Sequence, residues 1–173
     1  MKPKYPTIRT ERLVLQPLEE SDAGALFNIY QTEGVLRYFP NPNPPRMETV
    51  ERFICGQLAH WEEHGYGDWG ILLPGEDSLI GWAGLQYLHE LDETEVGFLL
   101  DRPYWGRGLA TEAALASLRF GFEHFSLDHM IALVHPENHA SIRVIEKCGM
   151  RRVDCRSLWG IELWRYQIDR DHF

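Results

Sequence analysis

The fold is decided by residues 95–112, which read EVGFLLDRPYWGRGLATE. An apolar run of strand length is followed by a glycine loop and then by residues typical of the first turn of a helix. The start of a helix leaves main-chain N–H groups unpaired and carries the positive end of the helix dipole, so anions bind there. Gly106 and Gly108 allow positive φ and a close approach of the backbone, and Arg107 adds a charged donor. The segment therefore predicts an anion-binding loop at the start of a helix.

Two better-known phosphate loops are excluded by the residues themselves. The pattern G-x-x-x-x-G-K-[ST] is absent, and the dinucleotide pattern G-x-G-x-x-G fails because Thr111 stands at its third glycine. Two interpretations of the loop remain. It binds a phosphate, or it is an ordinary connection between strand and helix that uses glycine for its geometry. The loop alone leaves both open.

Helical periodicity continues from this loop and appears in three other places. Apolar residues at steps of three and four predict a helix from Ser21, as N-cap, to Gly34, and three more at 47–64, 107–124 and 138–148. Strand-like patterns occupy the segments 12–18, 68–73, 79–87, 93–101, 129–134, 150–155 and 158–168. The order β-α-α-β-β-β-α-β-α-β-β predicts an α/β (α+β) chain, one domain over 1–173, with helices packed on a mixed sheet.

Composition restricts the possible partners. The formal charge of −9 argues against a nucleic-acid surface and favours a cationic or amine ligand. Cys55, Cys148 and Cys155 are an odd number without C-x-x-C spacing, so we expect neither a disulfide framework nor a zinc site, and a cytoplasmic location. The eight histidines lack metal-ligand spacing such as H-E-x-x-H, so no metal is expected. No stretch approaches the ~20 apolar residues of a membrane span, and no leader is expected at the N-terminus.

A second motif follows the loop by about thirty residues. It runs NHASIRVIEKCGM over 138–150, and it joins three other motifs, RTERLVL at 9–15, IGWAGL at 80–85 and WGRGLATEA at 105–113. Together these motifs resemble the GNAT acetyltransferase superfamily, and within it the RimJ/RimL-like branch of ribosomal-protein N-acetyltransferases. The resemblance covers nearly the whole chain in order.

The resemblance implies a GNAT acyl-CoA N-acyltransferase fold, with a mixed, mostly antiparallel sheet of seven strands, four helices, and splayed fourth and fifth strands. Acetyl-CoA, as co-substrate, is implied to enter the gap between those two strands. The implied cofactor-binding residues are main-chain groups of Phe98, Leu99 and Leu100, the loop and helix start at Gly106, Arg107, Gly108, Leu109, Ala110 and Thr111, and the helix residues Asn138 and Ser141.

Two positions depart from the family pattern. Pro103 stands where many members have Gln or Arg, so Arg102 and Arg107 are expected to compensate electrostatically. Ile145 stands where many members have a tyrosine that protonates the departing thiolate. A thiol has a pKa near 8.5, by analogy with cysteine, so the thiolate departs largely unassisted.

Acetyl transfer to an amine requires a free lone pair on nitrogen, and a lysine-type amine has a pKa near 10.4. Glu95, where the fourth strand begins, is the candidate catalytic base, and the alternative is a solvated strand residue like Glu93. Ser141 is the second catalytic candidate, as a hydrogen-bond donor to sulfur, and the alternative is a second helix cap. Main-chain N–H groups near Leu99 are expected to bind the oxyanion.

Other residues near the implied cleft have two interpretations. His135, before Pro136, is expected to be a loop residue rather than a base. A set of aromatic and histidine residues either lines the acceptor pocket or lies in the core, with core favoured for tryptophan: Phe39, Trp69, Trp82, Tyr87 and His89.

The predicted function is acetyl transfer from acetyl-CoA to a primary amine, of a protein N-terminus or a small molecule, by direct attack in a ternary complex. No covalent intermediate is expected, because Cys148 lies at a helix C-terminus, where the dipole disfavours a thiolate. The alternative is an acyl-CoA-binding regulatory module that has lost turnover. A monomer and a homodimer both fit.

Overall fold

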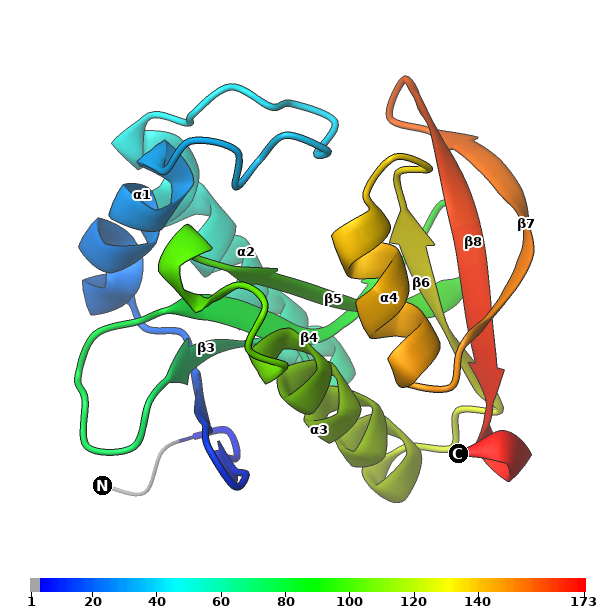
Figure 1. Ribbon diagram of the computed structural model, residues 1–173. Helices are drawn as coiled ribbons and strands as arrows, with labels where there is room; N and C mark the ends of the chain where they lie inside the picture. Colours follow the sequence, from blue (N-terminus) through cyan, green and yellow to red (C-terminus); the bar gives the residue numbers. More distant parts are fainter. Residues whose placement is uncertain (1–3) are drawn as a thin grey trace.

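The computed structural model describes residues 4–173 of the chain, so the expectation about the N-terminus lies partly outside the described residues. One sheet contains eight strands in the order β1-β2-β3-β4-β5-β6-β8-β7 (Figure 1). The strands are β1 (Ile8–Arg9), β2 (Val14–Pro17), β3 (Asp68–Leu72), β4 (Gly81–Leu88), β5 (Glu93–Leu100), β6 (His129–Val134), β7 (Arg151–Leu158) and β8 (Ile161–Asp169). The α-helices of residues 4–173 are α1 (Ala23–Gln31), α2 (Met47–His64), α3 (Leu109–His124) and α4 (His139–Lys147).

The GNAT-type topology, with its four α-helices and mixed sheet, is confirmed for the described residues, but the strand count of seven was low by one. The additional strand is β1, which pairs with β2 at two positions. The turn between them is closed by Thr10, whose N–H donates to the Leu13 carbonyl at 3.0 Å and whose hydroxyl accepts from the Leu13 N–H at 3.0 Å. A strand of two residues is too short to show periodicity in a sequence.

The first helix begins later and ends earlier than predicted. Ser21 lies inside a 3₁₀ turn (Glu20–Asp22) and is not the N-cap of α1. The turn is closed instead by a reciprocal pair of side-chain contacts between Glu19 and Asp22. Residues 32–46, between α1 and α2, cross the top of the molecule (Figure 1). This segment contains Pro40, Pro42, Pro44 and Pro45 and is here called the proline-rich loop.

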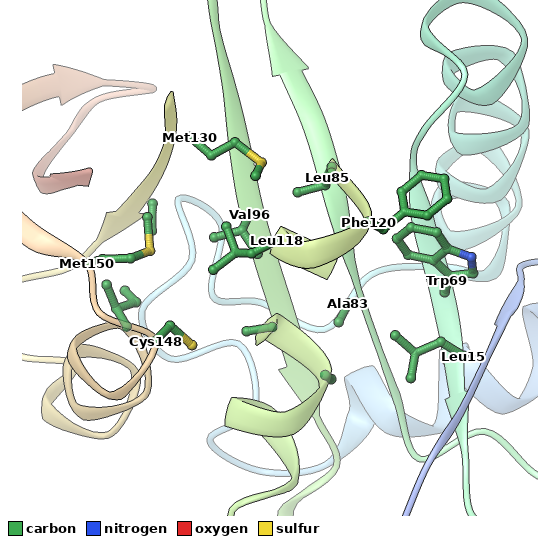
Figure 2. Packing of buried hydrophobic residues seen from close by; sticks show 14 of the residues in the cluster. Leu15, Trp69, Ala83, Leu85, Val96, Leu118, Phe120, Met130, Cys148 and Met150 are labelled. Carbon is green, nitrogen blue, oxygen red and sulfur yellow. The ribbon is translucent and has the colours of Figure 1, made fainter. Parts of the chain in front are cut away.

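Two hydrophobic layers hold the helices to the sheet. One layer lies between the sheet and α3 with α4, and it includes Trp69, Leu85 and Met130 (Figure 2). The other lies between the opposite face and α1 with α2. Gly121 lets α3 approach the sheet closely, because an added Cβ would lie 2.8 Å from Leu85 and from Met130 sulfur. Trp69 has no exposed surface, so its placement in the core is confirmed.

The pairing of β5 with β6 organises the functional region. Every other neighbouring pair of strands is antiparallel, whereas β5 and β6 are parallel and are paired at a single position, Glu95 with Ile131. Within the described chain, β5 has no paired partner on this edge beyond Glu95. The expected splay of these strands is therefore present.

An ion-pair cluster closes the unsplayed end of this gap. Glu93 on β5 accepts from Arg165 on β8 at 2.9 Å through Nε, and it also contacts the Arg165 Nη2 atom. His129 on β6 lies 2.9 Å from the same carboxylate. Burial alone would raise the pKa of Glu93, but the hydrogen bonds from Arg165 and His129 outweigh it and hold the pKa below its usual value. Glu93 is therefore a structural residue rather than a solvated one.

We predict that Glu93→Gln lowers the free energy of unfolding by about 3 kcal/mol, because Arg165, whose side chain is 7% exposed, keeps a buried charge without its partner. Urea denaturation at pH 7 measures the change. The double variant Glu93→Leu with Arg165→Met should recover most of the loss. Arg156→Gln, which breaks an exposed pair with Asp154, is the control and should cost less than ~1 kcal/mol. Equal losses for Glu93→Gln and Arg156→Gln would contradict a structural role for Glu93.

Candidate active site

A pocket of about 430 Å³ opens between the proline-rich loop, β5, β6 and α4. Four of the residues predicted from sequence line it together: Glu95, Phe98, Asn138 and Ser141. His135 and Ile145 line it as well. The structure therefore brings the strand predicted at 93–101, the segment that follows the strand predicted at 129–134, and the motif at 138–150 to one cavity.

On the open edge of β5, every second residue directs its main-chain N–H and carbonyl groups toward the gap. Asp101 donates its main-chain N–H to the Ile80 carbonyl, toward β4, at 2.8 Å. Successive residues of a strand direct their main-chain groups to opposite edges. Leu99 therefore directs its groups to β4, while Phe98 and Leu100 direct theirs to the gap. Trp105 supports this assignment, since its indole N–H donates to the Leu100 carbonyl at 2.7 Å. Of the three predicted arm-binding residues, Phe98 and Leu100 have the suitable orientation.

Glu95 lies where the β5–β6 pairing ends. Its Oε1 atom accepts from the Leu133 main-chain N–H on β6 at 3.1 Å. Burial raises the pKa of Glu95 to about 7, and the Leu133 hydrogen bond opposes part of that rise. The residue is half-buried and lines the pocket. Such a carboxylate is a proton acceptor tuned to neutral pH.

A second carboxyl group lines the pocket and was missed by the sequence analysis. Asp68, the first residue of β3, is 2% exposed, and burial together with the charge of Glu95 raises its pKa to about 8. The signal was present in the sequence, because Asp68 is a lone acidic residue inside the apolar run 66–73. A charged residue is rarely fully buried without a partner.

The second motif forms the start of α4. Asn138 is its N-cap and accepts from the Ser141 main-chain N–H at 3.2 Å, as predicted. The Ser141 hydroxyl makes no recorded capping bond within residues 4–173 and lines the pocket beside Ile145. Gly149 follows the helix with φ of +87°. The cap thus fixes the helix start while Ser141 faces the cavity.

The glycine loop has the predicted conformation. Gly106 and Gly108 have φ of +72° and +76°, and Gly108 is the N-cap of α3. The first recorded helical bond runs from Glu112 N–H to the Gly108 carbonyl, so the N–H groups of Leu109, Ala110 and Thr111 precede it. A Cβ added at Gly106 would meet no atom within 4 Å. The loop therefore combines open space with unpaired donors.

Two arginines flank this loop. Arg102 is exposed and lies 4.0 Å from Glu33, and the guanidinium of Arg107 lies 5.8 Å from the ring centroid of Tyr104. A third arginine, Arg12, holds the loop from the β1–β2 turn. It donates to the Arg107 carbonyl at 2.8 Å and to Glu112 at 2.7 Å. The motif at residues 9–15 thus positions the loop from a distant part of the chain.

The remaining candidates divide between pocket, core and surface. Trp82 and Phe39 line the pocket, whereas Tyr87 and His89 do not. His135 stacks on Tyr38 with ring centroids 5.2 Å apart. Among residues 4–173, one group has metal-ligand geometry, with ligand atoms of Glu63, His64 and His89 within 4.8 Å of one another, and it lies outside the pocket. No helix of residues 4–173 is long and apolar enough to span a membrane.

Known proteins resemble this chain in sequence and in structure. An acetyltransferase (GNAT) domain model matches residues 12–151. An uncharacterised N-acetyltransferase of Bacillus subtilis is 31% identical over 84% of this chain and 82% of its own. The spermidine N(1)-acetyltransferase of Escherichia coli K12 is 25% identical over 78% of this chain and 70% of its own. Among solved structures, the ribosomal L7/L12 α-N-protein acetyltransferase RimL, in complex with coenzyme A, has a TM-score of 0.81 at 16% identity and covers 97% of this chain and 100% of its own.

The domain match includes β5, the glycine loop and the start of α4, and of these β5 and the start of α4 line the pocket. GNAT acetyltransferases use acetyl-CoA, and the geometry of the β5–β6 gap accords with that. The chain therefore belongs to the GNAT acetyltransferase family and is an N-acetyltransferase.

Proposed function

We propose that the protein transfers the acetyl group of acetyl-CoA to a primary amine by direct attack in a ternary complex. The observation that carries this proposal is the convergence on one pocket of the Glu95 carboxylate, the open edge of β5 and the start of α4. Base, donor groups and a cavity for two substrates then lie together, which is the arrangement that direct transfer requires.

The chain's own groups fit an acetyl-CoA molecule along this gap. The main-chain groups of Phe98 and the Leu100 N–H are available to pair with the amides of the pantetheine arm, whereas the Leu100 carbonyl already accepts from Trp105. The N–H groups of residues 107–111 and the open space at Gly106 suit a pyrophosphate. Arg102 and Arg107 supply positive charge near the loop, which supports compensation for Pro103. Asn138 and Ser141 lie at the opposite side of the arm's path.

Glu95 acts as the base in this proposal. It takes a proton from the acceptor ammonium, and the freed nitrogen forms a bond to the thioester carbon. The carbon–sulfur bond then breaks, and the sulfur leaves as a thiolate. The nitrogen loses a second proton, which converts the thiolate to the thiol, and Glu95 releases the first proton to solvent. Ser141 donates a hydrogen bond toward the sulfur, a role that Ile145 cannot fill. The N–H groups of β5 that face the gap, at Phe98 and Leu100 rather than Leu99, stabilise the oxyanion.

A covalent route through cysteine has little support. Cys148 is buried, and burial raises the pKa of its thiol to about 12, so it is protonated at neutral pH. Its sulfur lies 4.0 Å from the Thr111 carbonyl, which also disfavours a thiolate. Direct attack is therefore the simpler mechanism.

We also propose a branch of the family, an acceptor class, a location and a domain organisation. The motifs at 9–15 and 138–150 support a place in the RimJ/RimL-like branch, but RimL at 16% identity supports the fold alone, so its ribosomal acceptor is not transferred. The acceptor is proposed only as a primary amine of a protein N-terminus or a small molecule. Three free cysteines, two of them exposed, support a cytoplasmic location. One sheet containing all the strands of residues 4–173 supports a single domain.

The alternative function, an acyl-CoA-binding module without turnover, is favoured by the apolar Ile145 at the pocket wall. Calorimetric titration with acetyl-CoA and measurement of thiol release with a panel of primary amines separate the two. We expect micromolar binding and amine-dependent thiol release. Binding without release for any amine would favour the module, and no binding would overturn both.

We predict that Gly106→Ala raises the Kd for CoA about tenfold, because the new methyl group enters the space assigned to the pyrophosphate. Gly75→Ala is the matched control, since Gly75 has φ of +82°, has the same open surroundings and lies in the β3–β4 turn. Both variants should lose about 1 kcal/mol of stability from left-handed strain. Equal Kd values for the two variants would remove the pyrophosphate from this loop.

We also predict that Glu95→Gln lowers kcat/KM for the amine about a hundredfold at pH 7, because the base is lost while the amide oxygen still accepts from Leu133. In the wild type, kcat/KM should rise with pH through an apparent pKa near 7, as Glu95 ionises. This limb should vanish in Glu95→Gln, with the Kd for acetyl-CoA unchanged. A limb near pH 7 that persists in the variant would assign the base to another group.

A further inference from the structure

Within residues 4–173, the Asp68 carboxyl group has no recorded protein partner. Its residue is 2% exposed, yet within the described chain its carboxyl oxygens make no recorded hydrogen bond or ion pair. The contacts recorded for Asp68 belong to its main chain, which accepts from Trp61 at 3.2 Å and donates to Gln57 at 3.0 Å. Because Asp68 lines the pocket, a guest molecule there is the group that can satisfy the carboxyl.

Two glycines lie between Asp68 and Glu95 on one face of the sheet. The register aligns Asp68 with Gly84 and Gly84 with Gly97, on three adjacent strands. Glu95 lies two residues from Gly97 and so on the same face of the sheet. A Cβ at Gly84 would lie 2.3 Å from the Gly67 carbonyl oxygen, 2.4 Å from the Asp68 Cα and 2.6 Å from an Asp68 carboxyl oxygen, so the β3 backbone and the Asp68 carboxyl fill that place. At Gly97 the Trp82 ring lies 3.3 Å from the Cβ position. The two glycines, here called the glycine strip, thus carry no side chain of their own between the carboxyl groups.

The other pocket walls suit a cation. No lysine or arginine is among the described residues that line the pocket. Seven aromatic side chains do line it: Tyr30, Tyr38, Phe39, Phe53, Trp82, Phe98 and Trp159. Aromatic faces attract organic cations. The Tyr30 hydroxyl accepts from the Trp82 indole at 3.0 Å, which leaves its own proton to donate.

We infer that Asp68 is a specificity-determining residue that binds a second positive charge on the acceptor, so that the pocket prefers diamines to monoamines. The inference rests on the proposed function, in which Glu95 takes a proton from the first ammonium. Strands lie about 4.8 Å apart, so the glycine strip from β3 to β5 spans roughly 10 Å of backbone. A short methylene chain with an ammonium group at each end fits along it.

The protonation of the free pocket agrees with this role. Burial raises the pKa of Asp68, and the Glu95 charge adds to the rise, so near pH 7 the free pair retains protons. Tyr30 is the other titratable side chain recorded as interacting with Asp68, and burial keeps it protonated by raising its pKa. A dication replaces the protons with ammonium groups, and both carboxylates then have partners.

Calorimetric titration of the CoA-bound protein with 1,4-diaminobutane and with n-butylamine tests the inference. Wild type should bind the diamine at least tenfold more tightly. Asp68→Asn should remove that difference by weakening the diamine, with butylamine unchanged, and Asp77→Asn, an exposed acid in the β3–β4 turn, should behave as wild type.

Three outcomes would overturn the role of Asp68. Wild type could bind both amines with equal affinity, or bind neither detectably. Asp68→Asn could also lose the same amount of affinity for both amines. The titration with CoA that precedes the amines tests the donor site separately. If CoA binds and a monoamine is acetylated without any diamine preference, the proposed function stands and this inference fails.

Thermal unfolding supplies a second readout. Because the pKa of Asp68 is raised in the folded state, its favourable contribution is complete below its unfolded pKa and is lost as pH rises through about 8. Asp68→Asn should therefore raise Tm by several degrees at pH 9 and by clearly less at pH 5, because most of the loss occurs between those two pH values. A lower Tm at pH 9 would show that Asp68 stabilises the fold, and would contradict its assignment to the acceptor.

Discussion

The hydrogen bond between the Glu95 carboxylate and the Leu133 main-chain N–H is the interaction on which the functional region depends. A parallel ladder between β5 and β6 would continue past Glu95 and Ile131, and it would satisfy Leu133 with a main-chain carbonyl. A side chain satisfies it instead, so the strands separate without leaving this N–H unpaired. The same atom that ends the ladder thereby places a carboxylate at the mouth of the gap. Strand separation and the position of the base have one cause.

The splay requires support at both ends. At the closed end, Glu93 ties β5 to β8 and β6 through Arg165 and His129, so the strands cannot separate further. At the open end, Trp105 binds the Leu100 carbonyl, and Arg12 binds both the Arg107 carbonyl and Glu112. These contacts fix the glycine loop relative to the edge of β5. The gap is thus supported by side chains from distant parts of the sequence, on the β1–β2 turn, β5, β6, β8 and the glycine loop.

The sequence predicted the parts of this arrangement that local chemistry determines. Gly106 and Gly108 were identified because left-handed backbone requires glycine, and Asn138 because a helix start requires a cap. Features that depend on tertiary register were not predicted. The main-chain direction of Leu99 follows from pairing with β4, and the burial of Asp68 follows from β3 lying under α2. The N-cap of the first helix was placed one residue early because Ser21 resembles a cap, although Asp22 is the N-cap and Glu19 and Asp22 close that turn. Periodicity locates elements, but it cannot say which neighbours they meet.

Two carboxyl groups facing one apolar pocket are costly for a protein to keep. Each must be desolvated, and they repel one another, so folding alone would favour an amide or an apolar residue at Asp68. Gly84 is explained by the sheet itself, because a Cβ there would lie 2.3 Å from the Gly67 carbonyl oxygen. The two carboxyl groups have no such explanation, and they line one pocket on one face of the sheet. Since uncompensated cost of this kind is typical of binding and catalytic sites, the pair of Asp68 and Glu95 is better explained by what the pocket binds than by how the sheet is built.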